Sequence, residues 1–290
     1  MPHNRPAQTG GGGMPRRRSR KKSGSGKSQA QLADVHRLYE ESVQDPPGDV
    51  AIVRRIYRKH FDREPRTLRE DFCGTAAMAC AWIKTHAENL AWGVDLDPEP
   101  LAWGRENHLA SLSEQQRQRI TLLQGDVRDV SHEPVDVTVG FNFSYFVFQE
   151  RDELVTYFRK ARSTLNDQGL FIVDLYGGAE AQRTLTETRE HDEWDYVWDQ
   201  DQFDPIHHHA MNYIHFEFPD GSRIDRAFTY DWRLWTIPEI RDAMRDAGFK
   251  ASEAYWERTD QKTNEGTGVY YRTERAADDP AWVAYVVGVR

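Results

Sequence analysis

The chain has few cysteines, no long apolar run and no overall excess of basic residues, and each shortage excludes a class of protein. Its 290 residues include only two cysteines, Cys73 and Cys80, in one short stretch. We therefore expect no disulfide framework and a reducing compartment. No apolar run approaches the roughly 20 residues that span a bilayer, and the basic N-terminus lacks the apolar core of a secretory signal. The sequence predicts a cytoplasmic protein with no membrane partner.

Charge is unevenly distributed along the chain. The sequence has 38 Lys+Arg against 47 Asp+Glu, for a net charge of −9. Residues 1–31 contain eight basic and no acidic residues, which leaves −17 on residues 32–290. A body this acidic repels polyanions, which argues against nucleic acid as a partner. Residues 1–31 are mainly small and basic, so we expect a disordered basic tail there.

Apolar runs alternate with helical patterns through the middle of the chain. Strands are predicted over residues 66–71, 90–95, 119–124, 135–141 and 170–175. Helices are predicted over 75–87 and 151–164, and another follows Asp97, which is expected to cap it with Pro98 at its first position. This alternation predicts an α/β fold with a doubly wound, mostly parallel, Rossmann-like sheet. Before it, residues 32–62 predict two helices separated at 45–48, in an N-terminal cap of residues 32–65.

The pattern changes to period two over about residues 185–235. Apolar residues alternate over 214–218 and 224–232 around a turn at 219–222, and a third strand is expected near 194–198. A helix is predicted over 238–247, followed by strands over 249–257 and 281–289. We interpret about 185–235 as an antiparallel β insertion, or lid, within a single domain of residues 32–290.

Acidic residues lie at the ends of three successive predicted strands. Asp71, Asp95 and Asp126 end the first, second and third, and a strand–turn–helix with one glycine, Gly74, follows the first. Parallel strands end at a common edge, where such turns approach small ligands. Clustered carboxylates are costly unless a ligand satisfies them, so a cationic nucleoside is favoured over a pyrophosphate. The turn alone also fits an ordinary buried βα connection, and a nucleotide-dependent oxidoreductase on the same sheet is a disfavoured alternative.

Four segments together resemble a known family. They are Glu70–Thr75, Gly93–Asp97, Gly125–Val127 and Phe141–Tyr145, which resemble motifs I to IV of the class I S-adenosylmethionine-dependent methyltransferases of small-molecule type. The resemblance covers about residues 66–175. It implies a seven-stranded sheet with a C-terminal antiparallel strand at about 281–289, and S-adenosyl-L-methionine as cofactor. The sequence departs from motif I at Cys73 and Ala76, which stand where glycine is common.

The resemblance also implies roles for individual residues. The loop from Asp71 to Thr75 would lie against the methionine part of the cofactor, Asp95 would hold the ribose, and Asp126 would face the adenine amino group. The full set of implied cofactor residues is Asp71, Phe72, Cys73, Gly74, Thr75, Asp95, Leu96, Asp126, Val127, Asn142 and Phe143. Methyl transfer needs alignment of donor and acceptor and exclusion of water, and no metal is expected.

Residues 142–145 bear on the methyl acceptor. The sequence Asn142-Phe143-Ser144-Tyr145 lies where nucleic-acid amino-methyltransferases carry Asn/Asp-Pro-Pro-Tyr/Phe, and both prolines are absent. With the acidic body, this favours a small-molecule acceptor, with Asn142 and Tyr145 as catalytic candidates. A nucleic-acid or protein amino-methyltransferase and a non-catalytic cofactor-binding module are the alternatives.

Aromatic residues supply the candidates for the acceptor site. Tyr39, His208, Arg233 and Trp235 are predicted to contact substrate, with ordinary packing as the competing explanation. Aromatic faces attract cations, which favours N-methylation over O-methylation. We place His207–His209 in a strand, where neighbouring side chains point to opposite faces, so a metal site there is disfavoured. The oligomeric state is not predicted.

Overall fold

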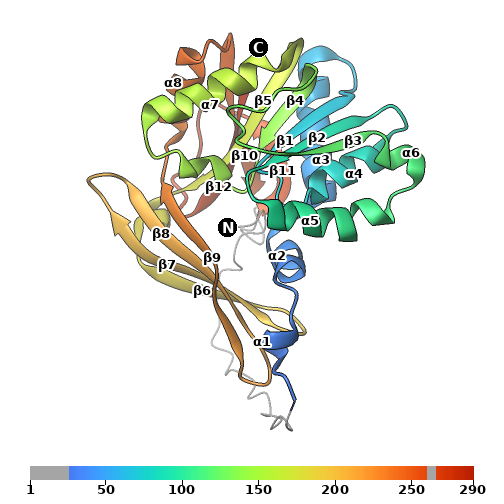
Figure 1. Cartoon of the computed structure of the whole chain (residues 1–290). Coiled ribbons are helices and arrows are strands. Elements are labelled where there is room, and N and C mark those ends of the chain that lie inside the picture. The colour runs from blue at the N-terminus through green and yellow to red at the C-terminus, as the bar shows by residue number, and fades with distance from the viewer. Residues whose placement is uncertain (1–25, 260–265) are drawn as a thin grey trace.

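The main sheet has eight strands in a computed structural model that describes residues 26–259 and 266–290 (Figure 1). Their spatial order is β11-β10-β12-β5-β4-β1-β2-β3. The strands are β1 (Thr67–Asp71), β2 (Leu90–Asp95), β3 (Ile120–Gln124), β4 (Val135–Gly140), β5 (Leu165–Gly177), β10 (Ala251–Thr259), β11 (Gly266–Arg272) and β12 (Trp282–Val289). Strands β1–β5 pair in parallel and β10–β12 antiparallel. The predicted fold class is confirmed, with β11 as an additional edge strand.

Helices cover both faces of this sheet. One buried layer joins α3 (Pro46–Phe61) and α4 (Ala77–Thr85) to the sheet, and the other joins α7 (Arg151–Ser163) and α8 (Ile237–Asp246). Strand β4 is buried at every residue, as a central parallel strand requires. Between β2 and β3, the chain forms α5 (Pro98–Asn107), the short 3₁₀ turn η1 (Leu109–Ser111) and α6 (Glu114–Arg117). Asp97 caps α5 with Pro98 at its start, as predicted.

The boundary between the first two long helices differs from the prediction. Asp45 is the N-cap of α3, and Pro46, Pro47 and Gly48 form the first turn of that helix, not a break before it. Proline is tolerated there because the first N–H groups of a helix have no intrahelical partner. The preceding helix α2 (Val35–Val43) ends at Gln44.

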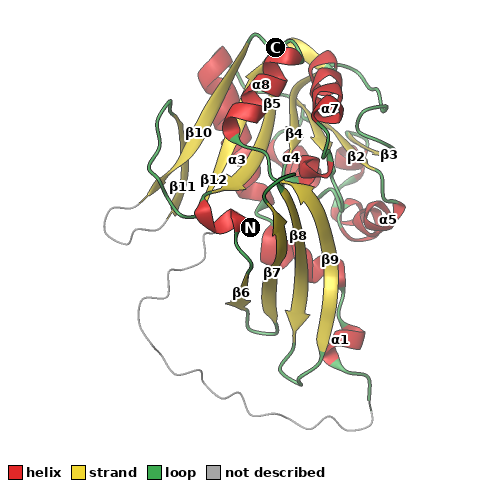
Figure 2. Cartoon of the chain, turned by 90° about the vertical axis from the view of Figure 1, so that its left-hand side faces the viewer, coloured by secondary structure: helices red, strands yellow, loops and turns green. Residues whose placement is uncertain are grey.

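A second, four-stranded antiparallel sheet projects from the main sheet (Figures 1 and 2). It contains β6 (Leu185–Glu190), β7 (Asp195–Asp204), β8 (His209–Glu217) and β9 (Arg223–Arg233), in that order. Three of these strands correspond to the predicted ones, and β6 is an added edge. His207 and His208 lie in the turn between β7 and β8, so their predicted place in a strand was wrong. A 3₁₀ turn, η3 (Ala179–Gln182), precedes β6.

The first described residues pack on the tip of this sheet. Ser28 caps the short helix α1 (Gln29–Leu32). The backbone N–H of Gln29 donates to Asp220 at 2.9 Å, and that of Ala30 donates to Ser222 at 3.0 Å. Ordered structure therefore begins before residue 32, and the remainder of the predicted tail, residues 1–25, lies outside the described residues. None of the helices in the described ranges combines the length and apolarity needed to cross a bilayer.

Candidate functional site

Strands β4, β1 and β2 end at one edge of the main sheet. Gly140 of β4 pairs with Asp71 of β1, and Asp71 pairs with Val94 of β2. The segments that leave these strands start at Phe72, Leu96 and Phe141, so the structure brings three of the predicted segments to one edge. This carboxyl edge is where open α/β sheets bind ligands.

The loop after β1 has a left-handed backbone at alternate residues. The φ angles are 56° at Phe72, 52° at Gly74 and 61° at Ala76. In the sequence, Cys73 and Ala76 are the residues that stand where the family motif commonly has glycine. In the structure, the non-glycine residues with a left-handed backbone are Phe72 and Ala76. Cys73 is instead buried with a free thiol, like Cys80. A Cβ added at Gly74 would meet no atom within 4 Å, so the loop faces open space at this residue.

Asp95 connects this loop to the end of β2. Its Oδ2 accepts a hydrogen bond from the Gly74 N–H at 2.7 Å, and its Oδ1 accepts one from the Asp97 N–H at 2.9 Å. Burial raises the pKa of the Asp95 carboxyl, partly offset by these backbone donors. The neighbouring Leu96 is 69% exposed. A part-buried carboxyl group at the end of β2 is thus followed directly by an exposed apolar residue.

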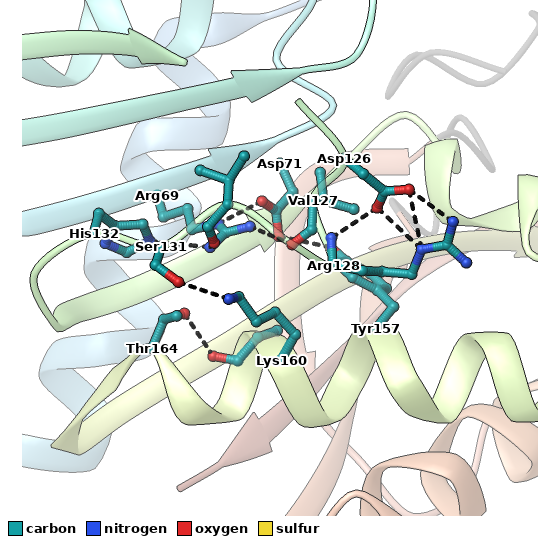
Figure 3. A network of polar contacts seen from close by, with 12 residues as sticks. Arg69, Asp71, Asp126, Val127, Arg128, Ser131, His132, Tyr157, Lys160 and Thr164 are labelled. Carbon is teal, nitrogen blue, oxygen red and sulfur yellow. Dashed lines mark hydrogen bonds and ion pairs between the residues drawn. The ribbon is translucent and has the colours of Figure 1, made fainter. Parts of the chain in front are cut away.

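The Asp71 side chain is bonded within the protein, and the role that the resemblance implies for this residue is one for its backbone. Its Oδ1 accepts from Arg69 Nε at 2.5 Å and its Oδ2 from the Tyr157 hydroxyl at 3.0 Å (Figure 3). The side chains of both ion-pair partners are fully buried. Arg69 and Asp71 are two residues apart in β1, so both lie on the same face of the strand. Only the backbone of Asp71 remains available to the loop.

Asp126 is already neutralised by a neighbouring residue. Arg128 donates to both of its carboxylate oxygens, from Nε at 3.0 Å and Nη2 at 2.7 Å, and from its backbone N–H at 2.8 Å (Figure 3). These bonds lower the pKa of Asp126. Val127 is buried and its carbonyl accepts from Arg69 Nη2 at 2.6 Å. Asp126 and Val127 therefore lie after β3 with Asp126 bound to Arg128, and their role toward the adenine stays a prediction.

Asn142 and Phe143 form a strained turn after β4. Both have left-handed φ angles, of 57° and 59°. Their backbone N–H groups donate to the two carboxylate oxygens of Asp174, at 2.9 and 3.0 Å. Asp174 lies in β5 and is 1% exposed. A buried carboxylate from the neighbouring strand thus holds the turn, a role that the sequence did not indicate.

Tyr145 cannot take the catalytic role predicted for it in this arrangement. It lies in the 3₁₀ turn η2 (Ser144–Val147), is fully buried, and donates its hydroxyl to the Asp174 carbonyl at 2.9 Å. Its ring packs against Phe146 and Phe158. Of the two catalytic candidates, only Asn142 is partly exposed beside the edge.

Helix α2 contacts the loop through a residue that the sequence did not single out. Glu40 accepts a hydrogen bond from the Thr75 hydroxyl and is 2.6 Å from His108 Nε2, at the end of α5. Trp103 of α5 also donates to Asp34, the N-cap of α2, at 2.8 Å. These contacts link segments far apart in the sequence, so no local pattern could have indicated them.

Glu70 is a second acidic residue missed at this edge. It lies on the face of β1 opposite Asp71 and accepts from the Ala79 N–H, in the first turn of α4, at 2.8 Å. Burial raises the pKa of Glu70 to about 8, with further contributions from the negative charges of Asp49, Asp95 and Glu40. The structure therefore gathers an excess of carboxyl groups around the loop.

The protonation of Glu70 predicts a pH-dependent stability. Its pKa is about 8 in the folded protein against an ordinary value of 4.5, so folding takes up a proton between these values. Stability should fall as pH rises from about 4.5 to 8, at no more than about 1.4 kcal/mol per pH unit. Urea unfolding of wild type and Glu70→Gln across this range measures it. The variant should lose this component; parallel pH dependences in the two proteins would contradict the prediction.

The four predicted substrate residues connect the second sheet to the rest of the molecule. Tyr39 of α2 packs on Phe228, with ring centroids 4.7 Å apart. Arg233 donates to the Gln149 carbonyl at 3.0 Å and lies over Trp235, which donates to the Phe148 carbonyl.

His208 turns its Nδ1 toward the Leu234 carbonyl, at 2.9 Å. The contacts of Arg233 and Trp235 hold them against residues 148 and 149, in the segment that follows β4, and the predicted roles of the four residues in substrate binding stay predictions. Within the described ranges, no group of three or more His, Cys, Asp or Glu is placed to hold a metal ion.

Solved structures share this arrangement of elements. An S-adenosylmethionine-dependent methyltransferase from Clostridium acetobutylicum matches with a TM-score of 0.62 at 17% identity, over 88% of this chain and 97% of that one. The sugar N-methyltransferase KedS8 from a Streptoalloteichus species matches at 0.60 and 18%, over 93% and 97%. CalS10, an S-adenosylmethionine-bound amino pentose methyltransferase from Micromonospora echinaspora, matches at 0.61 and 14%, over 87% and 97%.

No protein-family model and no curated protein matches the sequence. At these low identities the structural matches establish the fold: the chain has the fold of S-adenosylmethionine-dependent methyltransferases, over nearly the whole length of those proteins.

Proposed function

We propose that this protein is an S-adenosylmethionine-dependent methyltransferase acting on a small molecule. The observation that carries the proposal is the bond from the Gly74 N–H to Asp95, at the carboxyl edge of the sheet. It fixes a carboxylate beside a loop that faces open space, with exposed Leu96 alongside.

The described residues fit this cofactor. Asp95 has further acceptor capacity for ribose hydroxyls, because the Gly74 and Asp97 N–H groups donate to different oxygens and each oxygen has a second lone pair. Leu96 offers an apolar contact for the adenine, and Gly74 allows close approach of the methionine part. When bound, the cofactor supplies an electrophilic methyl group on a positively charged sulfur. The protein's contribution is to bind, orient and exclude water.

We favour a nitrogen acceptor. Glu40 and Asp95 place carboxylates beside the loop, and a carboxylate attracts amines as well as a sulfonium. Two of the structural matches are titled a sugar N-methyltransferase and an amino pentose methyltransferase, which supports the same choice. Residues 32–65 would act as a cap, attached to the loop through Glu40 and Thr75, and the β6–β9 sheet as a lid.

Calorimetric titration with S-adenosylhomocysteine tests the cofactor site. Wild type should bind in the micromolar range, and Asp95→Ala should bind about tenfold more weakly or worse, roughly 1.4 kcal/mol. The loss follows because the variant lacks both the ribose acceptor and the bond that holds Gly74.

Asp97→Ala is the matched control for this titration. Asp97 is an exposed acid in the same loop, and it caps α5 by accepting from the Glu99 N–H. We expect its affinity for S-adenosylhomocysteine to stay near that of wild type. No binding by wild type would refute the proposed cofactor. Binding without methyl transfer to any of a broad set of amines would instead favour a non-catalytic module.

A further inference from the structure

Glu40 of α2 is a carboxylate that the N-terminal cap places against the loop after β1. Its Oε1 accepts a hydrogen bond from the Thr75 hydroxyl and lies 2.6 Å from His108 Nε2, at the end of α5. Thr75 directly follows Gly74, which faces open space and donates its N–H to Asp95. Glu40 and Asp95 therefore hold adjacent residues of the loop that is proposed to contact the cofactor.

The protein engages only one of the two carboxylate oxygens of Glu40. Both contacts are made by Oε1, and Oε2 accepts no hydrogen bond from the residues that the structure describes. The Glu40 side chain is 17% exposed, and His108 supplies a counter-charge only when it is protonated. A carboxylate held this far from water is costly unless donors satisfy it. Glu40 Oε2 can therefore accept a donor from a ligand that lies against the loop.

Three other carboxyl groups near this loop are engaged elsewhere. The Asp71 side chain belongs to a fully buried ion pair within β1. Glu70 points to the opposite face of β1, and burial raises its pKa to about 8, so it is largely uncharged at neutral pH. In the proposed function, Asp95 accepts the ribose hydroxyls. Glu40 is thus the charged carboxylate beside the loop that remains for a positively charged group of the ligand.

We propose that Glu40 binds the α-ammonium group of the methionine part of S-adenosylmethionine. The inference rests on the proposed function, in which this part of the cofactor lies against residues 71–75. An ammonium group combines three N–H donors with a positive charge, and it forms strong bonds to carboxylates. The carboxylate of the methionine part would be repelled by Glu40. Because the amino-acid end carries one charge of each sign, its binding leaves the net charge that attracts an amine acceptor unchanged.

Calorimetry with two ligands that differ only in the ammonium group tests the proposal. S-adenosylhomocysteine is compared with 5′-S-(3-carboxypropyl)-5′-thioadenosine, the same molecule without its amino group, whose affinity is measured by displacement where direct heat is small. Wild type should bind the deamino compound about tenfold more weakly or worse. Glu40→Gln keeps an acceptor oxygen for Thr75 but loses the charge. It should bind S-adenosylhomocysteine about tenfold more weakly than wild type, and the deamino compound no more weakly than wild type.

Glu41→Gln makes the same chemical change one residue further along α2. The Glu41 side chain is 45% exposed and pairs with Arg37 at 2.7 Å, so it has a partner within its own helix. Its replacement should leave the affinities for both ligands at their wild-type values. The comparison separates the position of Glu40 from a general loss of negative charge in the cap.

The outcomes separate this inference from the proposed function. If wild type binds S-adenosylhomocysteine, the cofactor site stands, and the inference is overturned when Glu40→Gln weakens both ligands by the same factor or weakens neither. Equal weakening would show that Glu40 only holds the loop. A loss seen with S-adenosylmethionine but not with S-adenosylhomocysteine would place Glu40 at the sulfonium and also overturn the inference. If wild type binds neither ligand, the proposed function fails, and the inference fails with it.

Discussion

Replacing Asp71 with alanine is expected to destabilise the protein by about 3–5 kcal/mol, the usual cost of removing one partner from a buried ion pair. The side chains of Arg69 and Asp71 are fully buried and 2.5 Å apart. Without Asp71, the Arg69 guanidinium keeps only neutral partners, including the Val127 and Val130 carbonyls. The Tyr157 hydroxyl also loses its acceptor. Urea unfolding, followed through the shift in midpoint, measures the effect.

Two further variants make the result specific to the buried pair. Glu114 makes an exposed ion pair with Arg117, so Glu114→Ala should change stability by no more than the roughly 0–1 kcal/mol of surface pairs. The double replacement Arg69→Met with Asp71→Leu removes both charges and should recover most of the loss. An Asp71→Ala variant as stable as Glu114→Ala would show that Asp71 is not the counter-charge of Arg69.

The Arg69–Asp71 pair also positions the site. Arg69 binds the carbonyls of Val127 and Val130 at 2.6 and 3.2 Å, which holds the segment after β3 against β1 (Figure 3). Where Asp71→Ala remains folded, we therefore expect weaker S-adenosylhomocysteine binding than in wild type. The contribution of Asp71 is made from inside the sheet and not by contact with the ligand.

Much of this fold could be predicted because its signals are local. Some strands gave apolar-rich runs, such as residues 170–175 of β5, and Asp97 with Pro98 gave a complete helix start. The edge strands β6 and β11 were missed because they have few buried residues to produce a period-two pattern. The sequence could have predicted that Glu70 and Asp71 point to opposite faces of β1, since alternate residues of a strand share a face. It could also have predicted a pair between Arg69 and Asp71, which are two residues apart and therefore on the same face.

The remaining site residues depend on contacts between distant segments. Glu40 reaches Thr75, and Asp174 reaches Asn142 and Phe143, only through the packing of α2 and the register of β4 beside β5. No spacing rule within one segment connects such residues. Tyr145 illustrates the converse, because its position in a motif-like sequence suggested a catalytic role while the fold buries it.

The second large effect is expected at Asp174. Asp174→Ala leaves the N–H groups of Asn142 and Phe143 without their acceptors in a buried turn, at about 1–3 kcal/mol each. The left-handed backbone at both residues adds strain that the lost bonds no longer offset. We expect a total loss of about 2–5 kcal/mol in unfolding free energy.

The appropriate comparison for Asp174 is Asp220, an aspartate with the same kind of bonds but open to solvent. Asp220 accepts from the backbone N–H groups of Gln29 and Ser222, both at 2.9 Å. Water can replace these bonds, so Asp220→Ala should cost about 1 kcal/mol or less. Equal losses in the two variants would contradict the holding role of Asp174. If Asn142 lines the passage to the methyl group, as the resemblance implies, Asp174→Ala should also lower turnover about a hundredfold in the folded protein, with a smaller change in S-adenosylhomocysteine affinity.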